Sequence, residues 1–280
     1  MQGRLYIIPT PIGNLKDITV RAIEILKSAD IIAAEDTRQT LKLLNHYNIK
    51  KPMISYHMHN EKSRGCEITD KLQNGINIAL VSDAGMPGIS DPGSDIIKKC
   101  IEEGISFEVL PGATAAITAL IYSGLNTAGF IFKGFLPREN KNRKAVLDDI
   151  KDRCETIILY EAPHRLNETL LALKETLGSR KISICRELTK IHEEVLRITV
   201  DQAIEYYKAN SPKGEFVIVI EGKTSEEVEK EKKAVWENIT IEQHIEKYIG
   251  QGLSKKEAVK KVASDRHMPK SEVYKFSIDL

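Results

Sequence analysis

The chain has 280 residues, enough for two domains that each bury a core of their own. Its 41 Lys and Arg face 40 Asp and Glu, so net charge gives no sign of a polyanion partner and any nucleic-acid surface must come from local clusters. The four cysteines are far apart, which argues against a disulfide framework or a zinc site and predicts reduced, mostly buried thiols in a cytoplasmic protein. No run approaches the roughly 18 apolar residues of a membrane span, and residues 1–13 are too weakly apolar for a secretory signal.

The first part of the chain alternates short apolar runs with segments of helical spacing. The helices expected from spacing include 18–29, which starts near Asp17 or Thr19, and 94–101. The expected strands are 5–8, 30–34, 53–55, 76–81 and 107–110. Such alternation predicts a mostly parallel sheet whose polar residues gather at one strand end.

The stretch Val81–Gly93 is the most distinctive segment of the sequence. It holds three Gly, two Pro and two Asp between a buried strand and a helix. Asp83 and Asp91 therefore stand at the carboxyl end of a strand, where open α/β sheets bind ligands. Carboxylates there suit ribose hydroxyls or an amine better than a phosphate. An ordinary strand-to-helix turn is the alternative, but this density of Gly, Pro and Asp exceeds what a turn requires.

The second part of the chain repeats the pattern after a helix of small apolar residues at 115–123. Strands are expected at 130–135, 156–160, 182–186, 195–200 and 216–220, with helices at 138–152, 164–177 and 201–209. The short connection between 182–186 and 195–200 predicts antiparallel pairing and a mixed sheet. We therefore expect an N-terminal α/β domain at 1–115 and a second α/β domain at 116–223, with the boundary near residues 112–125.

From Thr224 to the end the sequence predicts a charged linker and a small helical module, residues 224–280. Residues 226–233 are nearly all charged, and 241–249 and 253–262 are amphipathic helices. A Ser254–Glu257 capping box starts the second helix, and Pro269 precedes a third. Seven Lys and Arg against four Asp and Glu in 251–280 leave two interpretations open, a plain helical bundle and a helix-turn-helix-like nucleic-acid module.

The sequence lacks the motifs of several common nucleotide-binding and hydrolytic sites. The sequence has neither GxGxxG after the first strand nor a P-loop, and it has no GxSxG. His57 and His59 have no acidic or Cys partners of known placement, so we expect no metal. Six polar segments instead follow predicted strands, which predicts one nucleoside-like ligand and one substrate between the two domains. These segments are 9–14, 35–38, 82–93, 111–115, 160–165 and 186–190.

In the same order and with little gapping, these motifs resemble one family, the ribosomal RNA small subunit methyltransferases I of the tetrapyrrole methylase superfamily. The likeness runs from about residue 4 to 222, and the tail resembles that family's small C-terminal helical module. The segments that carry it are 10–15, 34–38, 55–61, 82–93, 160–165 and 186–190. Met86 stands where the family usually has Thr, and Ala113-Thr114 where it has Pro-Ser.

The resemblance implies two α/β domains of the tetrapyrrole-methylase type and S-adenosylmethionine as methyl donor. The acceptor it implies is the ribose 2′-hydroxyl of a cytidine in the decoding region of 16S rRNA, in the assembled 30S subunit. It also implies a homodimer, while the lack of a long apolar run predicts no membrane attachment. The implied donor contacts are Pro11, Ile12, Gly13, Asp83, Ala84, Gly85, Met86, Pro87, Gly112, Ala113, Thr114, Ala115, Tyr160, Glu161 and Ala162.

A ribose hydroxyl is a poor nucleophile, so a base or a positive neighbour is expected to assist it. For each candidate acid a structural salt bridge with a neighbouring Arg stays open as the alternative. The candidate bases are Glu35, Asp36, Glu161, His164 and Glu187. The arginines that could hold phosphates or stabilise the alkoxide are Arg38, Arg165 and Arg186.

Local basic clusters are the expected RNA contacts. Lys and Arg at the start of the helix after residue 138 oppose the helix dipole, which favours an external polyanion over a merely solvated helix start. The candidates are Arg138, Lys141, Arg143, Lys144, Arg186 and Lys190.

Two other functions compete with this interpretation. A methyltransferase for a tetrapyrrole or similar small macrocycle would use the same fold but needs neither the basic segment 138–144 nor the C-terminal module. A non-catalytic RNA- or ribosome-binding protein does not need so many charged residues at the strand ends.

Overall fold

The computed structural model describes residues 2–224, 226–228, 230, 236 and 238–278. Contacts divide the chain into two units. The larger comprises Met1–Ile150 with Glu155–Glu221, and the smaller comprises Lys151–Cys154 with Gly222–Leu280. Among the described residues no helix combines the length and hydropathy that crossing a bilayer requires.

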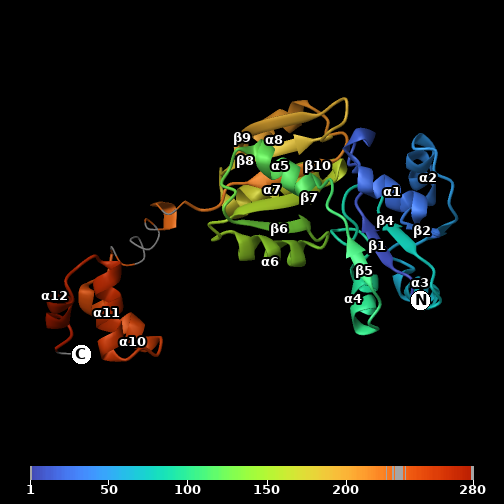
Figure 1. Cartoon of the computed structure of the whole chain (residues 1–280). Helices are drawn as coiled ribbons and strands as arrows, with labels where there is room; N and C mark the ends of the chain where they lie inside the picture. The colour runs from blue at the N-terminus through green and yellow to red at the C-terminus, as the bar shows by residue number, and fades with distance from the viewer. Residues whose placement is uncertain (1, 225, 229, 231–235, 237, 279–280) are drawn as a thin grey trace. The chain divides into compact units, whose positions relative to one another are not determined.

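Five parallel strands form the first sheet of the larger unit, in the order β3-β2-β4-β1-β5 (Figure 1). Their bounds are β1 Leu5–Ile8, β2 Ile31–Ala34, β3 Met53–Ser55, β4 Ile78–Val81 and β5 Phe107–Val109. Val81 is in register with both Ile8 and Ala34, so the carboxyl ends of β1, β2 and β4 are level. The loops that leave these three strands therefore begin side by side.

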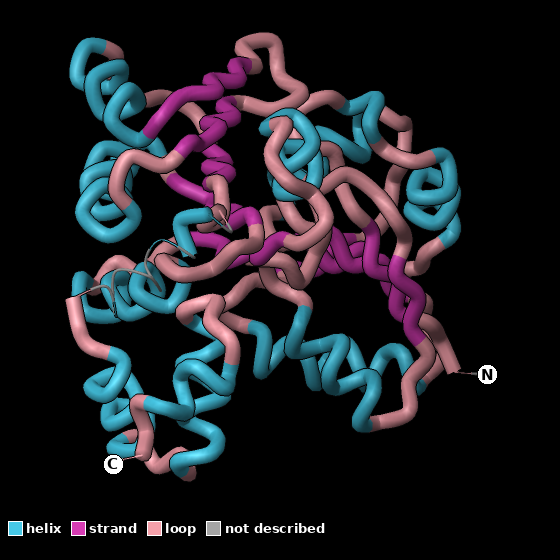
Figure 2. The backbone as a smooth tube through the Cα atoms, turned by 90° about the vertical axis from the view of Figure 1, so that its left-hand side faces the viewer, coloured by secondary structure: helices cyan, strands magenta, loops and turns pink. Residues whose placement is uncertain are grey.

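Helices cover both faces of the first sheet, as Figure 2 shows. On one face α1 (Val20–Ser28) and α2 (Thr37–His46) pack through Leu26 and Leu44. On the other, α3 (Glu61–Gln73) and α4 (Ser94–Glu102) pack through Ile68 and Ile96. Thr19 caps α1 by accepting from the Ala22 amide, which confirms the predicted start of that helix.

The second sheet has the order β6-β7-β10-β8-β9, with β6 parallel to β7 and the remaining pairs antiparallel. Its strands are β6 Phe130–Phe135, β7 Thr156–Glu161, β8 Lys181–Arg186, β9 Glu194–Thr199 and β10 Phe216–Ile220. The predicted mixed sheet and its antiparallel pair β8–β9 are confirmed.

One helix, α5 (Ala115–Ser123), packs on the first face of this sheet through Ala119 and Leu120. The other face is covered by α6 (Asn140–Ile150), α7 (Leu166–Leu177) and α8 (Val200–Ala209). Because both sheets belong to one contact unit, the boundary expected near residues 112–125 stays a prediction.

The second unit contains three helices among its described residues, α10 (Ile241–Gly250), α11 (Lys255–Asp265) and α12 (Lys270–Lys275). Ile245, Val259, Val262 and Val273 form its small core. The capping box expected at Ser254 is present, with both reciprocal hydrogen bonds to Glu257. The charged stretch 226–233 lies partly outside the described residues.

The cysteines correct one expectation. Cys100 and Cys185 are buried, but Cys66 and Cys154 are exposed. Cys66 lies on the outer side of α3, where its Sγ is 3.0 Å from Lys99 Nζ. The prediction of mostly buried thiols is therefore wrong for two of the four.

Candidate active site

The loops that follow β1 and β4 are hydrogen-bonded to each other. The Thr10 amide donates to the Gly85 carbonyl (2.9 Å), and the Gly85 amide donates to the Thr10 carbonyl (3.0 Å). Thr10 Oγ1 also donates to the Ser82 carbonyl (3.1 Å). Gly85 has a φ of +81°, a backbone conformation that residues other than glycine rarely adopt. The pairing of the two loops therefore requires glycine at this position. The predicted segments 11–13 and 83–87 thus form one rigid structure.

The loop after β5 packs on the same pair of loops. A Cβ at Gly112 would lie 2.6 Å from Cβ of Pro9, so only glycine allows this approach. Tyr160, at the carboxyl end of β7, packs in one core cluster with Ala113, Ala115 and Ala116. The structure therefore brings together the 9–14, 82–93 and 111–115 loops and the end of β7.

The loop after β1 also reaches the second sheet. Ile12 packs in the core formed by α5 and that sheet, beside Leu188 and Val217. The Asn14 amide donates to Thr189 Oγ1 (3.0 Å). These contacts fix the strand ends of the first sheet against the loop that follows β8.

Gly13 makes the closest of these approaches, and its substitution gives a testable result. A Cβ there would lie 2.7 Å from the Leu188 carbonyl oxygen and 2.5 Å from Cγ of Lys190. We expect Gly13→Ala to destabilise the chain by about 1–3 kcal/mol in urea unfolding, the usual cost of overpacking. Gly65→Ala is the control, because a Cβ at Gly65 in α3 meets no atom within 4 Å. Equal stability of both variants would contradict the close packing of these loops.

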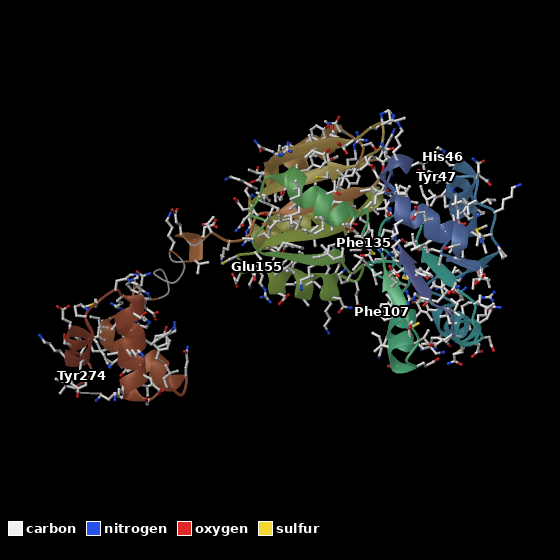
Figure 3. The ribbon with its side chains drawn as sticks, viewed as in Figure 1. His46, Tyr47, Phe107, Phe135, Glu155 and Tyr274 are labelled. Carbon is white, nitrogen blue, oxygen red and sulfur yellow. The ribbon has the colours of Figure 1, made fainter. Side chains whose placement is uncertain are left out.

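A bulge in β6 brings the loop after β4 to the second sheet. The register with β7 shifts between Phe132 and Gly134, and Gly134 has a φ of +63°. A Cβ at Gly134 would lie 3.0 Å from Ser90 Oγ. The next residue, Phe135, is half exposed, and its ring centroid lies 5.7 Å from that of Tyr160 where the two sheets meet (Figure 3).

Three acids gather where β2 and β4 end. The Asp36 amide donates to Asp83 Oδ1 (3.0 Å), and the Asp83 amide donates to Glu35 Oε2 (3.4 Å). Partial burial raises the pKa of both Glu35 and Asp83. Asp36 differs, because hydrogen bonds from Arg38 lower its pKa to about 2. Asp36 also caps α2 through the Arg38 amide, which gives it a structural role.

Asp91 lies in the same region, but its side chain has no bonding partner among the described residues. Within the described chain its carboxylate has neither a hydrogen bond nor an ion pair. Burial, together with the negative charges of Glu35, Asp83 and Glu215, raises its pKa to about 7. Asp91 thus faces acids from both sheets, and it is the carboxylate here whose protonation changes near neutral pH.

The one acid and the one arginine of the segment 160–165 take part in the packing of that segment. Glu161 is 2% exposed and accepts from Thr169 Oγ1 (2.5 Å) and the Ala162 amide (2.9 Å). Arg165 donates to the Leu136 carbonyl (2.6 Å) and approaches Glu161 at 3.5 Å. His164 is exposed. Because Glu161 is buried and each of its oxygens already accepts a hydrogen bond, its contacts position this loop.

The segment 186–190 is likewise cross-linked. Lys190 Nζ lies 2.8 Å from carboxylate oxygens of both Glu187 and Glu215, and Arg186 pairs with Glu194 at 3.0 Å. Glu187 Oε1 also accepts from the Glu215 amide (2.9 Å). These ion pairs occupy the residues that were expected to act on substrate or RNA, although Arg186 and Lys190 keep part of their surface exposed.

The basic start of α6 separates into two kinds of residue. Arg138, Lys141 and Lys144 are exposed. Arg143 is 9% exposed and pairs with Glu168 at 2.7 Å, so it attaches α6 to α7. Arg143 is therefore not available as an RNA contact in this structure.

A groove of about 430 Å³ lies beside the loop after β4. Met86, Pro87 and Ile89 form one wall, and side chains of α4 and β5, including Ile101 and Val109, form the other. Ile89, Ile101 and Val109 are 45%, 65% and 48% exposed. The groove is apolar and lies along an edge strand, features that suit a protein partner better than a charged small molecule.

Sequence reasoning missed two features of this region. Asp91 stood in the most distinctive motif, but nothing in the sequence showed that it would lack a partner. Phe135 had no signal, because the bulge at Gly134 that exposes it cannot be read from the residues. No group of three or more His, Cys, Asp or Glu suited to a metal occurs among the residues that the structure covers.

Known proteins share both the sequence family and the fold of this chain. Residues 4–204 match the family described as Tetrapyrrole (Corrin/Porphyrin) Methylases. The crystal structure of diphthine synthase aligns with a TM-score of 0.62 and 15% identity, covering 79% of this chain and 91% of that one. Uroporphyrin-III-C-methyltransferase from Thermus thermophilus aligns with a TM-score of 0.55 and 18% identity, covering 78% and 94%. The fold and the matched family define a methyltransferase of the tetrapyrrole methylase type.

Closer relatives narrow this class. The ribosomal RNA small subunit methyltransferase I of Bacillus subtilis is 53% identical over 272 residues, covering 97% of this chain and 93% of that protein. The protein of the same name from Synechocystis is 47% identical over 279 residues, covering 99% and 98%. The chain belongs to the ribosomal RNA small subunit methyltransferase I family. It is an enzyme, so the interpretation as a non-catalytic binding protein was wrong.

Proposed function

We propose that this enzyme transfers the methyl group of S-adenosylmethionine to the 2′-hydroxyl of a cytidine in the decoding region of 16S rRNA, in the assembled 30S subunit. Membership of the family supports small-subunit rRNA as the substrate. The tetrapyrrole alternative has weaker support, because the structural neighbours whose names contain uroporphyrin or precorrin are only 18% identical.

The observation that carries the choice of donor is the group of acids at the strand ends. S-adenosylmethionine carries a sulfonium and an ammonium but no phosphate. Glu35, Asp83 and Asp91 are drawn together with raised pKa values, and a bound cation would relieve that repulsion. We assign Asp83 and Glu35 to the ammonium. The remaining contacts are proposed for Pro11–Gly13, Ala84–Pro87, Gly112–Ala115 and Tyr160–Ala162.

Bound there, the donor supplies an electrophilic methyl group, and the chain's own residues align the acceptor and remove its proton. Of the candidate bases, Asp36, Glu161 and Glu187 are held by hydrogen bonds, and His164 is exposed. Asp91 is unbonded and has a pKa of about 7, close to the working pH that general-base catalysis favours. We therefore assign proton removal to Asp91. The half-exposed ring of Phe135, which continues the bulge at Gly134, is suited to stack on the cytosine.

Lys141 and Lys144 are proposed to contact phosphates of the rRNA, together with Arg138. Lys141→Gln with Lys144→Gln is expected to reduce the slope of log affinity against log salt concentration by about 1–2, without a change in melting temperature. Arg143→Gln is expected to lower the melting temperature by a few degrees and to leave that slope unchanged, because Arg143 pairs with Glu168. Filter binding at several salt concentrations measures both. The reverse pattern would remove α6 from the RNA surface.

We also propose a homodimer whose contact includes the apolar groove at Ile89, Ile101 and Val109. These exposed apolar side chains beside the edge strand β5 are the surface that a second copy would cover. Sedimentation equilibrium at micromolar concentration is expected to give twice the chain mass, and a monomer mass would contradict the proposal.

The function is tested by incubating the enzyme with isotopically labelled S-adenosylmethionine and 30S subunits that lack the modification, followed by nucleoside mass spectrometry. The label is expected in 2′-O-methylcytidine alone. Label in a base-methylated nucleoside, or no label in rRNA, would contradict the proposed reaction.

A further inference from the structure

The helical module carries a set of lysines that nothing in its fold uses. All six lysines of α11 and α12 are exposed, and none makes an ion pair within the described part of the chain. They are Lys255, Lys256, Lys260, Lys261, Lys270 and Lys275. Their charges therefore face solvent uncompensated.

Two of the acids in the same segment are held by local bonds. Glu257 Oε2 accepts from the amide and the hydroxyl of Ser254, at 3.0 and 2.5 Å. Asp265 accepts from the Tyr248 hydroxyl at 2.6 Å and lies 3.8 Å from His244 Nε2. Six exposed lysines stand against three acids in α11 and α12, Glu257, Asp265 and Glu272, so the charge that this part of the module presents to solvent is mostly positive.

The lysines also oppose the stability of their own helix. Lys255 and Lys256 occupy the first turn of α11, where positive charge is unfavourable to the helix dipole. Lys256 and Lys260 are four residues apart and repel each other on one side of the helix. The module's core is apolar, so folding does not require these charges. An arrangement that costs stability and fills no internal role indicates an external anionic partner.

Arg266 shows what a structural cation in this module looks like. Its guanidinium lies 4.9 Å from the centroid of the Trp236 ring and donates to the carbonyls of Ile239 (2.6 Å) and Thr240 (3.1 Å). It joins α11 to the segment before α10. The six lysines make no such contact.

The methyltransferase fold is complete without this module in one relative. The protein of the same name from Thermotoga maritima is 46% identical over 221 residues, which are 99% of that protein but only 79% of this chain. The two sheets alone, which end at Ile220, fill that length. That relative therefore has no counterpart of the module, which is consistent with a role for the module outside the two sheets.

We propose that the exposed lysines of α11 and α12 bind the sugar–phosphate backbone of small-subunit rRNA as a second RNA contact, separate from the one that holds the target nucleotide. The identity of the RNA rests on the proposed function. Tyr274 in α12, labelled in Figure 3, is 59% exposed, and Phe276 just after this helix is 41% exposed. Both rings add aromatic surface on which unpaired bases stack. This surface raises affinity for the substrate and leaves the chemical step alone.

The test uses the full chain with Lys255, Lys256, Lys260 and Lys261 replaced by Gln. Its affinity for protein-free 16S rRNA is expected to fall about tenfold. The slope of log affinity against log salt concentration is expected to fall by about three, because each of four phosphate contacts contributes about 0.7–0.9. KM for 30S subunits rises about tenfold, while kcat and the affinity for S-adenosylmethionine stay at wild-type values. The melting temperature stays equal to that of the wild type or rises. The matched control replaces four exposed lysines elsewhere, Lys27, Lys42, Lys50 and Lys62.

Wild-type affinity for free rRNA in the α11 variant, or an equal loss in the control, would overturn the inference. Loss of binding to the assembled subunit alone would also overturn it, because the partner would then be a ribosomal protein. A wild-type chain that binds rRNA but transfers no methyl group would contradict the proposed function instead. In that case the rRNA affinities of the lysine variants would still test the inference.

Discussion

Replacing Asp91 by asparagine is expected to lower kcat about a hundredfold, the usual contribution of a general base, and to leave the affinity for S-adenosylmethionine within about threefold. The carboxylate has no partner in the described chain, and charges from both sheets hold its pKa at about 7. Asparagine keeps its size and polarity but accepts no proton. Steady-state kinetics with unmodified 30S subunits at saturating donor measures the effect.

The same residue predicts the pH dependence. Because the base acts only when ionised, kcat/KM of the wild type, which reports the pKa values of the free enzyme, is expected to rise with pH through about 7, and the Asp91→Asn variant is expected to lack this step. The raised pKa also means that the folded chain binds this proton more tightly than the unfolded chain. Its contribution to stability is present below about pH 4 and is lost as the pH rises through about 7.

Asp70→Asn is a matched control, since Asp70 is an exposed acid on α3 and belongs to none of these loops. An unchanged kcat in Asp91→Asn, or a step near pH 7 that persists in it, would assign proton removal to another group.

Asp83→Asn is expected to weaken binding of S-adenosylmethionine by about 10- to 100-fold, the size of one hydrogen bond to a charged group. The amide oxygen of asparagine can still accept from the Asp36 amide, which now lies 3.0 Å from Asp83 Oδ1, so the loop is expected to keep its conformation. Only the negative charge toward the donor's ammonium is removed. Isothermal titration calorimetry measures the affinity.

Thermal melting of the same variant shows whether the fold is intact. The control variant is Asp17→Asn, at the exposed 3-10 turn Leu15–Asp17. Unchanged donor affinity in Asp83→Asn would remove the loop after β4 from the donor site. Loss of affinity with a lowered melting temperature would show that Asp83 is structural.

The parts of the account that could be read from the sequence depend on periodicity and local backbone rules. The apolar runs of β1, β2 and β4, the cap at Thr19 and the capping box at Ser254 follow from single residues and their neighbours. The short β8–β9 connection made antiparallel pairing the simplest arrangement. The helix α3 was not anticipated, because its apolar positions Ile68 and Leu72 are few among charged residues.

The roles of individual charges could not be predicted, because they depend on partners distant in sequence. Arg143 and Lys144 are neighbours in one basic run, yet only Arg143 finds Glu168 on the next helix. Glu161 looked like a catalytic acid beside Arg165, but Thr169, one helix turn beyond, buries it in a hydrogen bond. Asp91 is the converse case, a residue that stays without a partner because the loops of two sheets surround it with other acids.

A crystal structure of the enzyme with S-adenosylmethionine tests the central claim most directly. We expect the donor at the carboxyl ends of β2 and β4, with its ammonium on Asp83 and Glu35, its nucleoside against the 111–115 loop and Tyr160, and its methyl group toward Asp91. A donor bound elsewhere, or a pyrophosphate compound held at these strand ends, would contradict the account.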